Sequence, residues 1–135
     1  MKEPWENEPD YLSWDYKEVH CCIIRNYLGA LCGYVGVNKD HPLYGSKYSN
    51  FDVHGGITFF GNGIEGMKSD YWYFGFDCCH AGDLLPYYSS VLLEHINKVM
   101  KLEYRDICYV KEHVMRMAKK LAYYEFIAEE LLNDV

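Results

Sequence analysis

Short apolar runs alternate with polar, glycine-containing segments over the first two thirds of the chain. Val19–Arg25 and Leu31–Val37 are compact apolar runs with β-branched residues, which predicts two strands. Asn26–Gly29 has turn chemistry, so these two strands are predicted to form a hairpin. Val53–Gly61 and Asp70–Asp77 predict two further strands, and the aromatic residues of the second lie on both of its faces. This last run is therefore predicted to be a central strand covered on two sides.

The apolar spacing becomes helical in the last third of the chain. Ser89–Met100 predicts a middle helix, because its apolar residues follow the spacing of one helix face. A longer last helix is predicted from a stripe that steps by three or four residues: Ile107, Val110, Val114, Met117, Leu121, Tyr124, Ile127 and Leu131. We expect this stripe to pack against the sheet. The predicted fold class is α+β, with a small antiparallel sheet of about four strands packed by a long C-terminal helix and a shorter middle helix.

The chain is predicted to form a single domain over residues 1–135, because its length is near the commonest domain size. Residues 1–18 are predicted to be an irregular N-terminal arm that is both acidic and aromatic. Residues 19–86 are expected to hold the sheet with the candidate site, and residues 87–135 the helical part.

The net charge of −7 and a pI near 5.3 narrow the classes of partner. Direct binding of nucleic acid needs a basic footprint, so it is not expected, whereas an acidic surface can face a basic protein surface. No run approaches the ~20 apolar residues that span a bilayer, and the start is acidic, so we expect no membrane contact and a cytoplasmic location. Thiols stay reduced there, so the six cysteines are expected to be thiols or metal ligands.

Residues able to do chemistry concentrate at the end of the predicted strand Asp70–Asp77. Five of them fall within seven positions: Asp77, Cys78, Cys79, His80 and Asp83. If Val53–Gly61 is the antiparallel neighbour of this strand, His54 lies at the same end of the sheet. The sequence therefore predicts that two distant histidines and a thiol share one rim of the sheet.

A zinc site is the first interpretation of this cluster. Zinc takes about four tetrahedral nitrogen and sulfur ligands in a structural site. The candidate ligands are His54, His80, Cys78 or Cys79, and one cysteine of the predicted hairpin, Cys21, Cys22 or Cys32. Their spacing differs from the Cys-x-x-Cys pairs of common zinc motifs, so spacing alone leaves the ligand set open.

A catalytic or ligand-binding cluster is the second interpretation, and its residues are His54, Asp77, His80 and Asp83. A carboxylate can hold an imidazole in one tautomer and poise it for proton transfer. The third interpretation is structural, with carboxylates that cap turns and cysteines that pack as small hydrophobic residues. The other histidines are predicted to be structural: His20, His41, His95 and His113. Cys108 is predicted to be buried and inert.

Several runs carry a resemblance to a known family. In chain order they are Gly29–Val37, His41–Gly45, Val53–Phe59, Trp72–Asp83 and Tyr104–Val110. Over most of residues 18–122 the chain resembles a family of small, functionally unassigned proteins carried by phages, prophages and other mobile elements. The resemblance implies a genetic context and brings no activity. Its motif positions include the metal-ligand candidates Cys21, Cys32, His54, Cys78 and His80, whereas Cys79 stands where a small residue is more usual.

This context suggests a function by analogy alone. Small acidic phage proteins are often accessory factors that disarm host defence by binding a nuclease, or by sequestering or degrading a signal nucleotide. The leading hypothesis is a phage-derived protein that binds and inhibits a host defence component, as an anti-CRISPR inhibitor of an effector nuclease does. A zinc ion would hold the loop around His80. The alternative is a metal-dependent hydrolase, or a sponge, that acts on a nucleotide signal.

Overall fold

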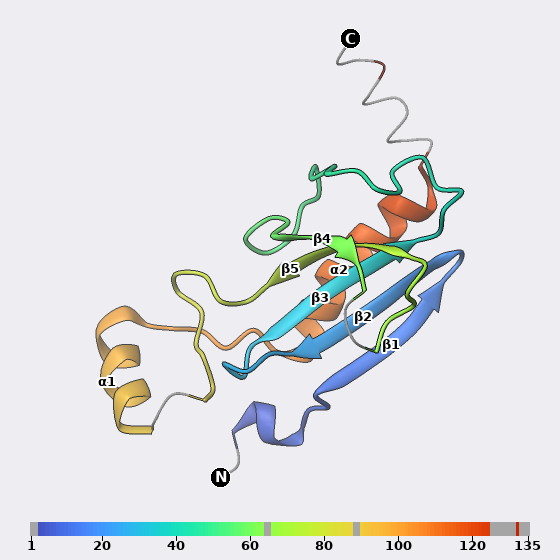
Figure 1. Ribbon diagram of the computed structural model, residues 1–135. Coiled ribbons are helices and arrows are strands. Elements are labelled where there is room, and N and C mark those ends of the chain that lie inside the picture. The colour runs from blue at the N-terminus through green and yellow to red at the C-terminus, as the bar shows by residue number, and fades with distance from the viewer. Residues whose placement is uncertain (1–2, 64–65, 88–89, 125–131, 133–135) are drawn as a thin grey trace.

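An antiparallel sheet in the order β1-β2-β3-β5-β4 forms the centre of the protein (Figure 1). The computed structural model describes residues 3–63, 66–87, 90–124 and 132. The strands are β1 (Tyr11–Tyr16), β2 (Val19–Arg25), β3 (Leu31–Val37), β4 (Phe59–Asn62) and β5 (Trp72–Asp77). The helices are η1 (Pro4–Asn7, a 3-10 helix), α1 (Ser90–Met100) and α2 (Ile107–Ala122). The predicted α+β class is confirmed, with five strands in the described residues where about four were expected.

The β2–β3 hairpin has the predicted bounds, because its turn is fixed by one side chain. The amide oxygen of Asn26 accepts hydrogen bonds from the backbone N–H groups of Leu28 and Ala30 at 2.9 and 3.1 Å. Gly29 has a φ of +83°, a conformation that glycine adopts without steric cost. The turn therefore closes where the sequence indicates.

Strand β1 corrects the prediction of an irregular arm over residues 1–18. It pairs with β2 in antiparallel register, with Trp14 opposite Cys21. Its side chains alternate between exposed and half-buried, which is the pattern of an edge strand with one covered face. The indole N–H of Trp14 donates to the sulfur of Met115 on α2 at 3.4 Å. Trp14 and Tyr16 thus pack on the covered face of the strand, whereas Tyr11 lies on its exposed face.

The predicted strand Val53–Gly61 is wrong at its beginning, since β4 starts only at Phe59. Gly55 and Gly56 have φ values of +69° and +76°, which a β-strand does not contain. The backbone N–H of Gly56 donates to the carbonyl oxygen of Val53 at 3.0 Å and closes a turn. His54 therefore lies in a turn. The antiparallel pairing of β4 with β5 is confirmed.

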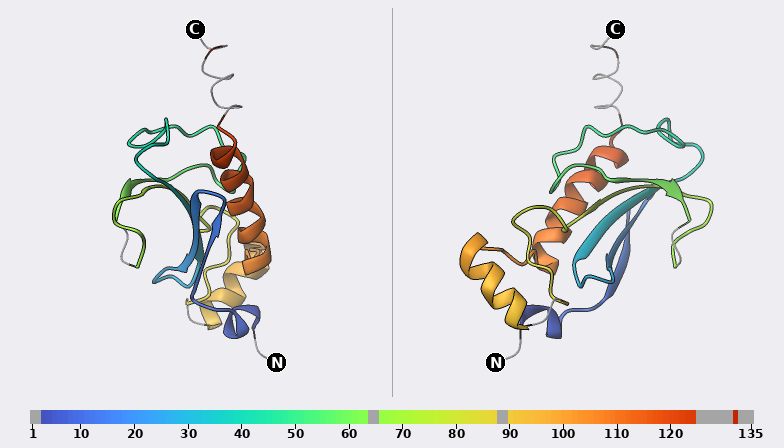
Figure 2. Two further views of the ribbon diagram at one scale, coloured as in Figure 1. Left: turned by 90° about the vertical axis from the view of Figure 1, so that its right-hand side faces the viewer. Right: turned by 60° about the vertical axis from the view of Figure 1, so that its left-hand side comes forward.

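Helix α2 covers one face of the sheet, mainly over β2 and β3 (Figure 2). The core side of its stripe is fully buried: Val110, Val114, Met117 and Leu121. A Cβ atom on Gly33 would lie 2.6 Å from both Val114 and Phe76, so this glycine allows the helix to approach the sheet closely. Tyr124 is exposed, and the predicted stripe residues Ile127 and Leu131 lie outside the described residues. Cys108 is exposed on α2, so the prediction that it is buried is wrong.

Helix α1 covers the described residues of the predicted middle helix, with Ser89 outside the described residues, but it does not pack on the sheet. It lies to the side of the domain in Figure 1 and in the right-hand view of Figure 2, and it contacts no other described helix or strand. Its side chains Val91, Val99 and Met100 are exposed. Within the described part of the chain, no helix combines the length and apolar character needed to cross a bilayer.

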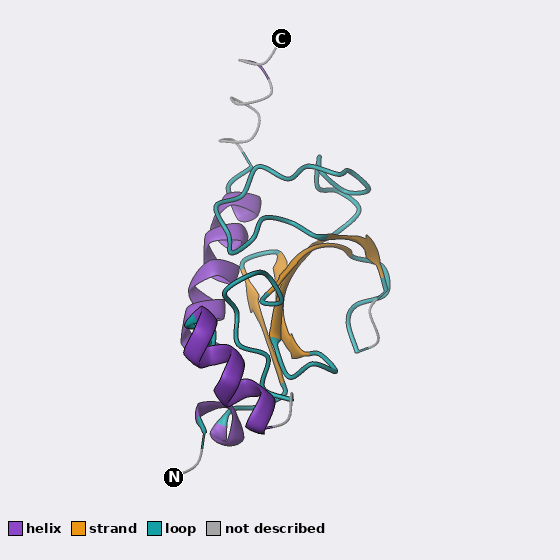
Figure 3. Cartoon of the chain, turned by 90° about the vertical axis from the view of Figure 1, so that its left-hand side faces the viewer, coloured by secondary structure: helices purple, strands orange, loops and turns teal. Residues whose placement is uncertain are grey.

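The sheet curves away from α2, so that its other face is concave (Figure 3). Strand alternation and register decide which residues line each face. Cys32, Tyr34 and Asp77 face the concave side, since Cys32 pairs with Asp77 and Tyr34 pairs with Gly75. Cys21 faces α2, because it pairs with Val35 of the core. Two of the predicted zinc ligands, Cys32 and Cys21, therefore lie on opposite faces of the sheet.

Candidate functional site

Asp83 is the centre of a polar cluster beside the first turns of α2. Only 1% of its side chain is exposed. Oδ2 accepts hydrogen bonds from Nε2 of His54 at 2.8 Å and from the backbone N–H of His80 at 2.9 Å. Oδ1 accepts one from Nε of Arg105 at 3.0 Å. Burial opposes the charged carboxylate, yet these donors outweigh burial and lower the pKa of Asp83.

His54 links Asp83 to α2. Its Nδ1 atom lies 2.8 Å from the hydroxyl oxygen of Tyr109, and its backbone N–H donates to Nδ1 of His113 at 2.9 Å. Because the carboxylate of Asp83 accepts from Nε2, a neutral His54 carries its proton on Nε2 and accepts the Tyr109 hydroxyl at Nδ1. Carboxylate, imidazole and phenol thus form one hydrogen-bonded chain, which we name the Asp83–His54–Tyr109 relay.

His113 contacts both His54 and Tyr109 of the relay, and it does so as a neutral imidazole. Its Nδ1 atom accepts a backbone N–H, so that nitrogen carries no proton. Burial lowers the pKa of His113, and the nearby Arg116 lowers it further. The ring of His113 stacks on that of Tyr109 at a centroid distance of 4.4 Å. Both side chains project from α2, which therefore fixes the geometry of the relay.

His80 lies between the relay and the concave face of the sheet. Its ring centroid is 5.7 Å from that of His54. Its Nε2 atom is 3.3 Å from Oδ1 of Asp77, yet it has no hydrogen bond of good geometry among the described residues. A Cβ atom on Gly55 would lie 2.1 Å from this nitrogen, so the ring edge rests directly on the glycine backbone. His54, Asp77, His80 and Asp83 therefore lie near one another, but only Asp77 and His80 line the groove, so the four do not share one pocket as predicted.

A groove of about 550 Å³ opens on the concave face and ends at His80 and Asp77. This volume lies within the range of about 300–1,000 Å³ that is usual for ligand sites. Its lining combines aromatic and polar side chains: Tyr27, Tyr34, Phe59, Thr58, Asp77 and His80. Asp77 accepts hydrogen bonds from Oγ1 of Thr58 at 2.8 Å and from the backbone N–H of Cys79 at 3.0 Å.

The predicted zinc ligands are only partly brought together. Cys32 and His80 both line the groove, but Cys21 and Cys78 are buried in the core that α2 covers. His54 is held by Asp83 and Tyr109. In the part of the chain that the structure describes, no three His, Cys, Asp or Glu side chains are grouped so that they could hold a metal ion. Zinc stays a prediction, and metal analysis of protein purified without added zinc measures it.

Sequence reasoning missed three members of the cluster: Tyr109, Arg105 and His113. His113 was predicted to be structural, and Tyr109 and Arg105 were not singled out. One sequence signal could indicate that Tyr109 and His113 act together: they are four residues apart and share a face of the last helix. The partner of that face, the turn at His54, could not be known without the tertiary structure.

Comparisons with protein-family models, with curated proteins and with solved structures find no match to this chain. Function must therefore be inferred from geometry. The geometry offers two features, the buried relay and the open groove with the exposed segments beside it. The relay is largely satisfied by its own hydrogen bonds, whereas the groove and its surroundings expose side chains that can contact a partner.

Proposed function

We propose that this chain is a protein-binding inhibitor, and that the groove and α1 are the two parts of its binding surface. We name this surface the docking face. Its residues are Tyr27, Tyr34, Phe59, Tyr87, Val91, Val99 and Met100. The proposal rests on one observation, the exposure of apolar side chains on a helix that contacts no other described helix or strand.

Helix α1 is hard to explain as part of a free-standing domain. An isolated helix of this length is marginal in water, because its nucleation costs more than a few turns recover. Val91 and Val99 are 78% and 72% exposed, so they contribute little to the stability of this chain. Contiguous exposed apolar side chains commonly mark interaction sites. A protein partner that covers α1 would supply the missing apolar contacts.

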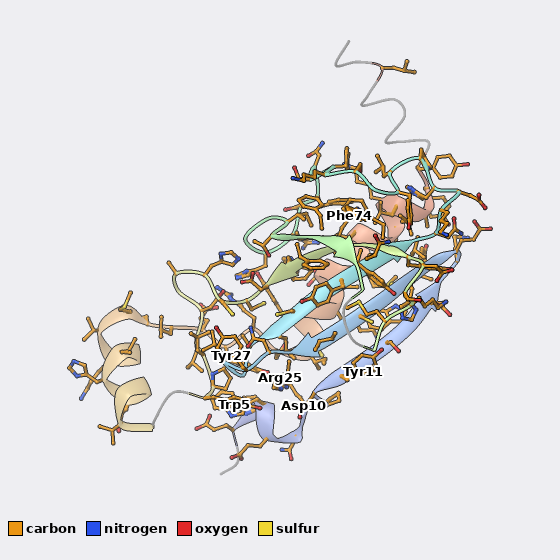
Figure 4. The ribbon with its side chains drawn as sticks, in the orientation of Figure 1. Trp5, Asp10, Tyr11, Arg25, Tyr27 and Phe74 are labelled. Atoms are coloured by element: carbon orange, nitrogen blue, oxygen red, sulfur yellow. The ribbon has the colours of Figure 1, made fainter. Side chains whose placement is uncertain are left out.

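The groove is connected to α1 through two exposed tyrosines. Tyr27 lies at the end of the β2–β3 hairpin, next to Arg25 (Figure 4), and lines the groove. The backbone N–H of Tyr87, shortly before α1, donates to the carbonyl oxygen of Leu28 in the same turn. Both tyrosines are more than half exposed. Tyrosine supplies large contact area at a low cost in conformational entropy, as is common at interfaces.

Charge indicates the kind of partner. The chain carries a net charge of −7, and the described lining of the groove contains the carboxyl group of Asp77 but no Lys or Arg. Two copies of an acidic chain repel each other, whereas a basic protein surface is attracted. Proteins that handle nucleic acid present such basic surfaces. The proposed partner is therefore a basic, nucleic-acid-handling protein of the host.

The family resemblance makes this partner more specific. A phage-derived protein that covers the basic channel of a host defence nuclease would block access of nucleic acid to it. We therefore propose inhibition of a defence component, with an RNA-guided effector nuclease as the example to test first. The support is the acidic charge, the unpartnered helix and the resemblance, and the cytoplasm is the compartment in which the two proteins would meet.

The test uses target-DNA cleavage by purified RNA-guided effector nucleases, each assayed with and without the chain. Inhibition of at least one effector is expected, together with a stable complex on gel filtration. The double variant Val91→Asp, Val99→Asp places carboxylates on α1 and should weaken inhibition at least tenfold. The matched control, Tyr123→Asp, changes an exposed aromatic residue at the far end of α2 and should inhibit as the unmodified chain does.

Two results would contradict the proposal. One is an absence of inhibition across the effectors tested, together with no complex. The other is equal inhibition by the α1 double variant and the unmodified chain, which would remove α1 from the binding surface. Circular dichroism of every variant checks that the domain remains folded, so that lost inhibition is not lost structure.

A second candidate function is supported by the relay. A hydrogen-bonded chain of Asp83, His54 and Tyr109 could move a proton in a hydrolase that acts on a nucleotide signal. The phosphates of such a ligand need free cations, but Arg105 is paired with Asp83 and Glu103. Thermal-shift screening with nucleotides and cyclic nucleotides tests this alternative, since a ligand that binds only the folded state raises Tm.

A further inference from the structure

Two cysteine sulfur atoms share one hydrogen-bond donor at the floor of the groove. The side-chain nitrogen of Asn26 lies 3.6 Å from Sγ of Cys32 and 3.1 Å from Sγ of Cys79. The orientation of this amide is fixed, because its oxygen already accepts the N–H groups of Leu28 and Ala30. One amide group thus holds both thiols on the same side of the turn, and their separation cannot exceed the sum of the two distances.

The backbone also places these cysteines as cross-strand neighbours. Cys32 pairs with Asp77, and the N–H of Cys78 donates to the carbonyl oxygen of Leu31, which continues the pairing by one residue. Cys79 is therefore diagonal to Cys32 on the same face of the sheet, where Cβ atoms are about 7 Å apart or less. Disulfide formation therefore requires a shift of the loop after β5, because the bond brings the two sulfurs to about 2 Å.

The other described cysteines lack this arrangement. Cys21 and Cys78 are buried in the core beneath α2, and Cys22 is fully buried beside Tyr11 and His20. Cys108 is exposed alone on α2. Cys79, in contrast, is half-buried at the groove, where a small molecule can reach it.

We propose that Cys32 and Cys79 form a redox modification site, which reacts with a low-molecular-weight disulfide and closes to an intramolecular disulfide. The thiolate of Cys79 attacks one sulfur of the small disulfide and forms a mixed disulfide, and the first leaving thiolate takes up a proton. The thiolate of Cys32 then attacks the Cys79 sulfur and releases the second small thiol. The two protein thiols lose two electrons and two protons, and the small disulfide gains them.

The new bond would act on the groove directly. The backbone N–H of Cys79 is a donor to Asp77, so movement of Cys79 toward Cys32 disturbs that hydrogen bond. His80, the next residue, moves with it. Closure of the disulfide therefore changes the polar end of the groove while the helix-covered face of the sheet keeps its packing.

The experiment uses the full chain with Cys108→Ser, which removes the exposed thiol, and oxidised glutathione as the probe. Burial raises the pKa of Cys32 to about 12 and also raises that of Cys79, so the reaction is followed for hours at about pH 8.5. Intact mass should fall by two hydrogen atoms, and peptide mapping should link Cys32 to Cys79. With Cys32→Ser added, Cys79 should retain one glutathione, and with Cys79→Ser the link should be lost.

Three results would overturn the inference: a glutathione adduct that persists on Cys79 when Cys32 is present, a link that uses another cysteine, or no reaction at Cys79. Circular dichroism of both serine variants checks that each is folded. No protein partner takes part in the assay, so its outcome is independent of the proposed inhibition.

Discussion

Nε2 of His54 lies 2.8 Å from Oδ2 of Asp83, although the two residues are 29 positions apart. This contact joins the turn before β4 to the loop after β5. Tyr109 and Arg105 extend it to α2 and to the segment before it. The turn before β4 and the loop after β5 are thereby held together next to His80.

Removal of the Asp83 charge should destabilise the fold. Asp83→Asn keeps the shape of the side chain but cannot accept from His54, His80 and Arg105 as a carboxylate does. We expect a loss of about 2–4 kcal/mol in the free energy of unfolding, because a buried charge-assisted network is broken. Urea denaturation followed by circular dichroism measures it. Asp40→Asn, at an exposed position, is the matched control and should change stability little.

The lowered pKa of Asp83 also predicts that the free energy of unfolding falls at acid pH. The pKa of Asp83 is lower in the folded chain than in the unfolded chain. Its contribution is therefore fully present above the unfolded value of about 4, and it is lost as pH falls through the lower folded value. Asp83→Asn should lack this part of the pH dependence. An unchanged slope between about pH 4 and pH 2 would contradict the assignment.

A second pH effect is expected from buried histidine. Burial lowers the pKa of His113, and burial also lowers that of His41. The unfolded chain therefore binds more protons than the folded chain below about pH 6.5, and stability should fall by up to about 1.4 kcal/mol per pH unit for each histidine. His113→Gln should flatten the slope measured from about pH 7 to pH 5.

The relay makes a prediction for the hydroxyl of Tyr109. Tyr109→Phe removes the donor to Nδ1 of His54 and should lower the free energy of unfolding by about 1 kcal/mol. The proton on Nε2 should remain, because Asp83 and not Tyr109 fixes the tautomer. NMR of the histidine ring nitrogens measures the tautomer of His54 in the unmodified chain and in the variant. Tyr27→Phe changes an exposed tyrosine and serves as the control, and a proton on Nδ1 in the unmodified chain would contradict the relay as described.

Local patterns predicted those elements whose signals are contained in the element itself. Val19–Arg25 and Leu31–Val37 have the predicted bounds, since apolar runs and the Asn26 turn define them locally. The acidic, aromatic sequence of β1 predicts an irregular arm, and this prediction is wrong. Its alternation becomes meaningful only when α2 covers one face, through contacts such as that of Trp14 with Met115.

The candidate site was predicted in part, for a similar reason. His54, His80 and Asp83 were expected together, and they are together, although His54 reaches the cluster from a turn and not from a strand. The role of His113 depends on a backbone N–H about sixty residues earlier, and no local pattern contains that partner. The resemblance favours Cys78 over Cys79 as a ligand, but the pleat turns Cys78 into the core and Cys79 toward the groove.

The close contact between His80 and Gly55 gives the sharpest test of the site. Gly55 and its neighbour Gly56 both have positive φ values, so alanine at either position costs about 1–2 kcal/mol in backbone strain. Only Gly55 has a side chain in the way, since a Cβ atom there would meet Nε2 of His80 at 2.1 Å, whereas one on Gly56 would meet nothing within 4 Å. Gly55→Ala should therefore destabilise the chain clearly more than Gly56→Ala does.

A double-mutant cycle separates the clash from the strain. His80→Ala removes the ring, so in the Gly55→Ala background it should restore stability to the level of Gly56→Ala, although alone it should be neutral or slightly destabilising. Denaturant midpoints of the four proteins, with Gly56→Ala as reference, give the interaction energy between the two positions. Equal losses for the two alanine variants, or no rescue by His80→Ala, would mean that His80 does not rest on this turn and that the end of the groove is built differently.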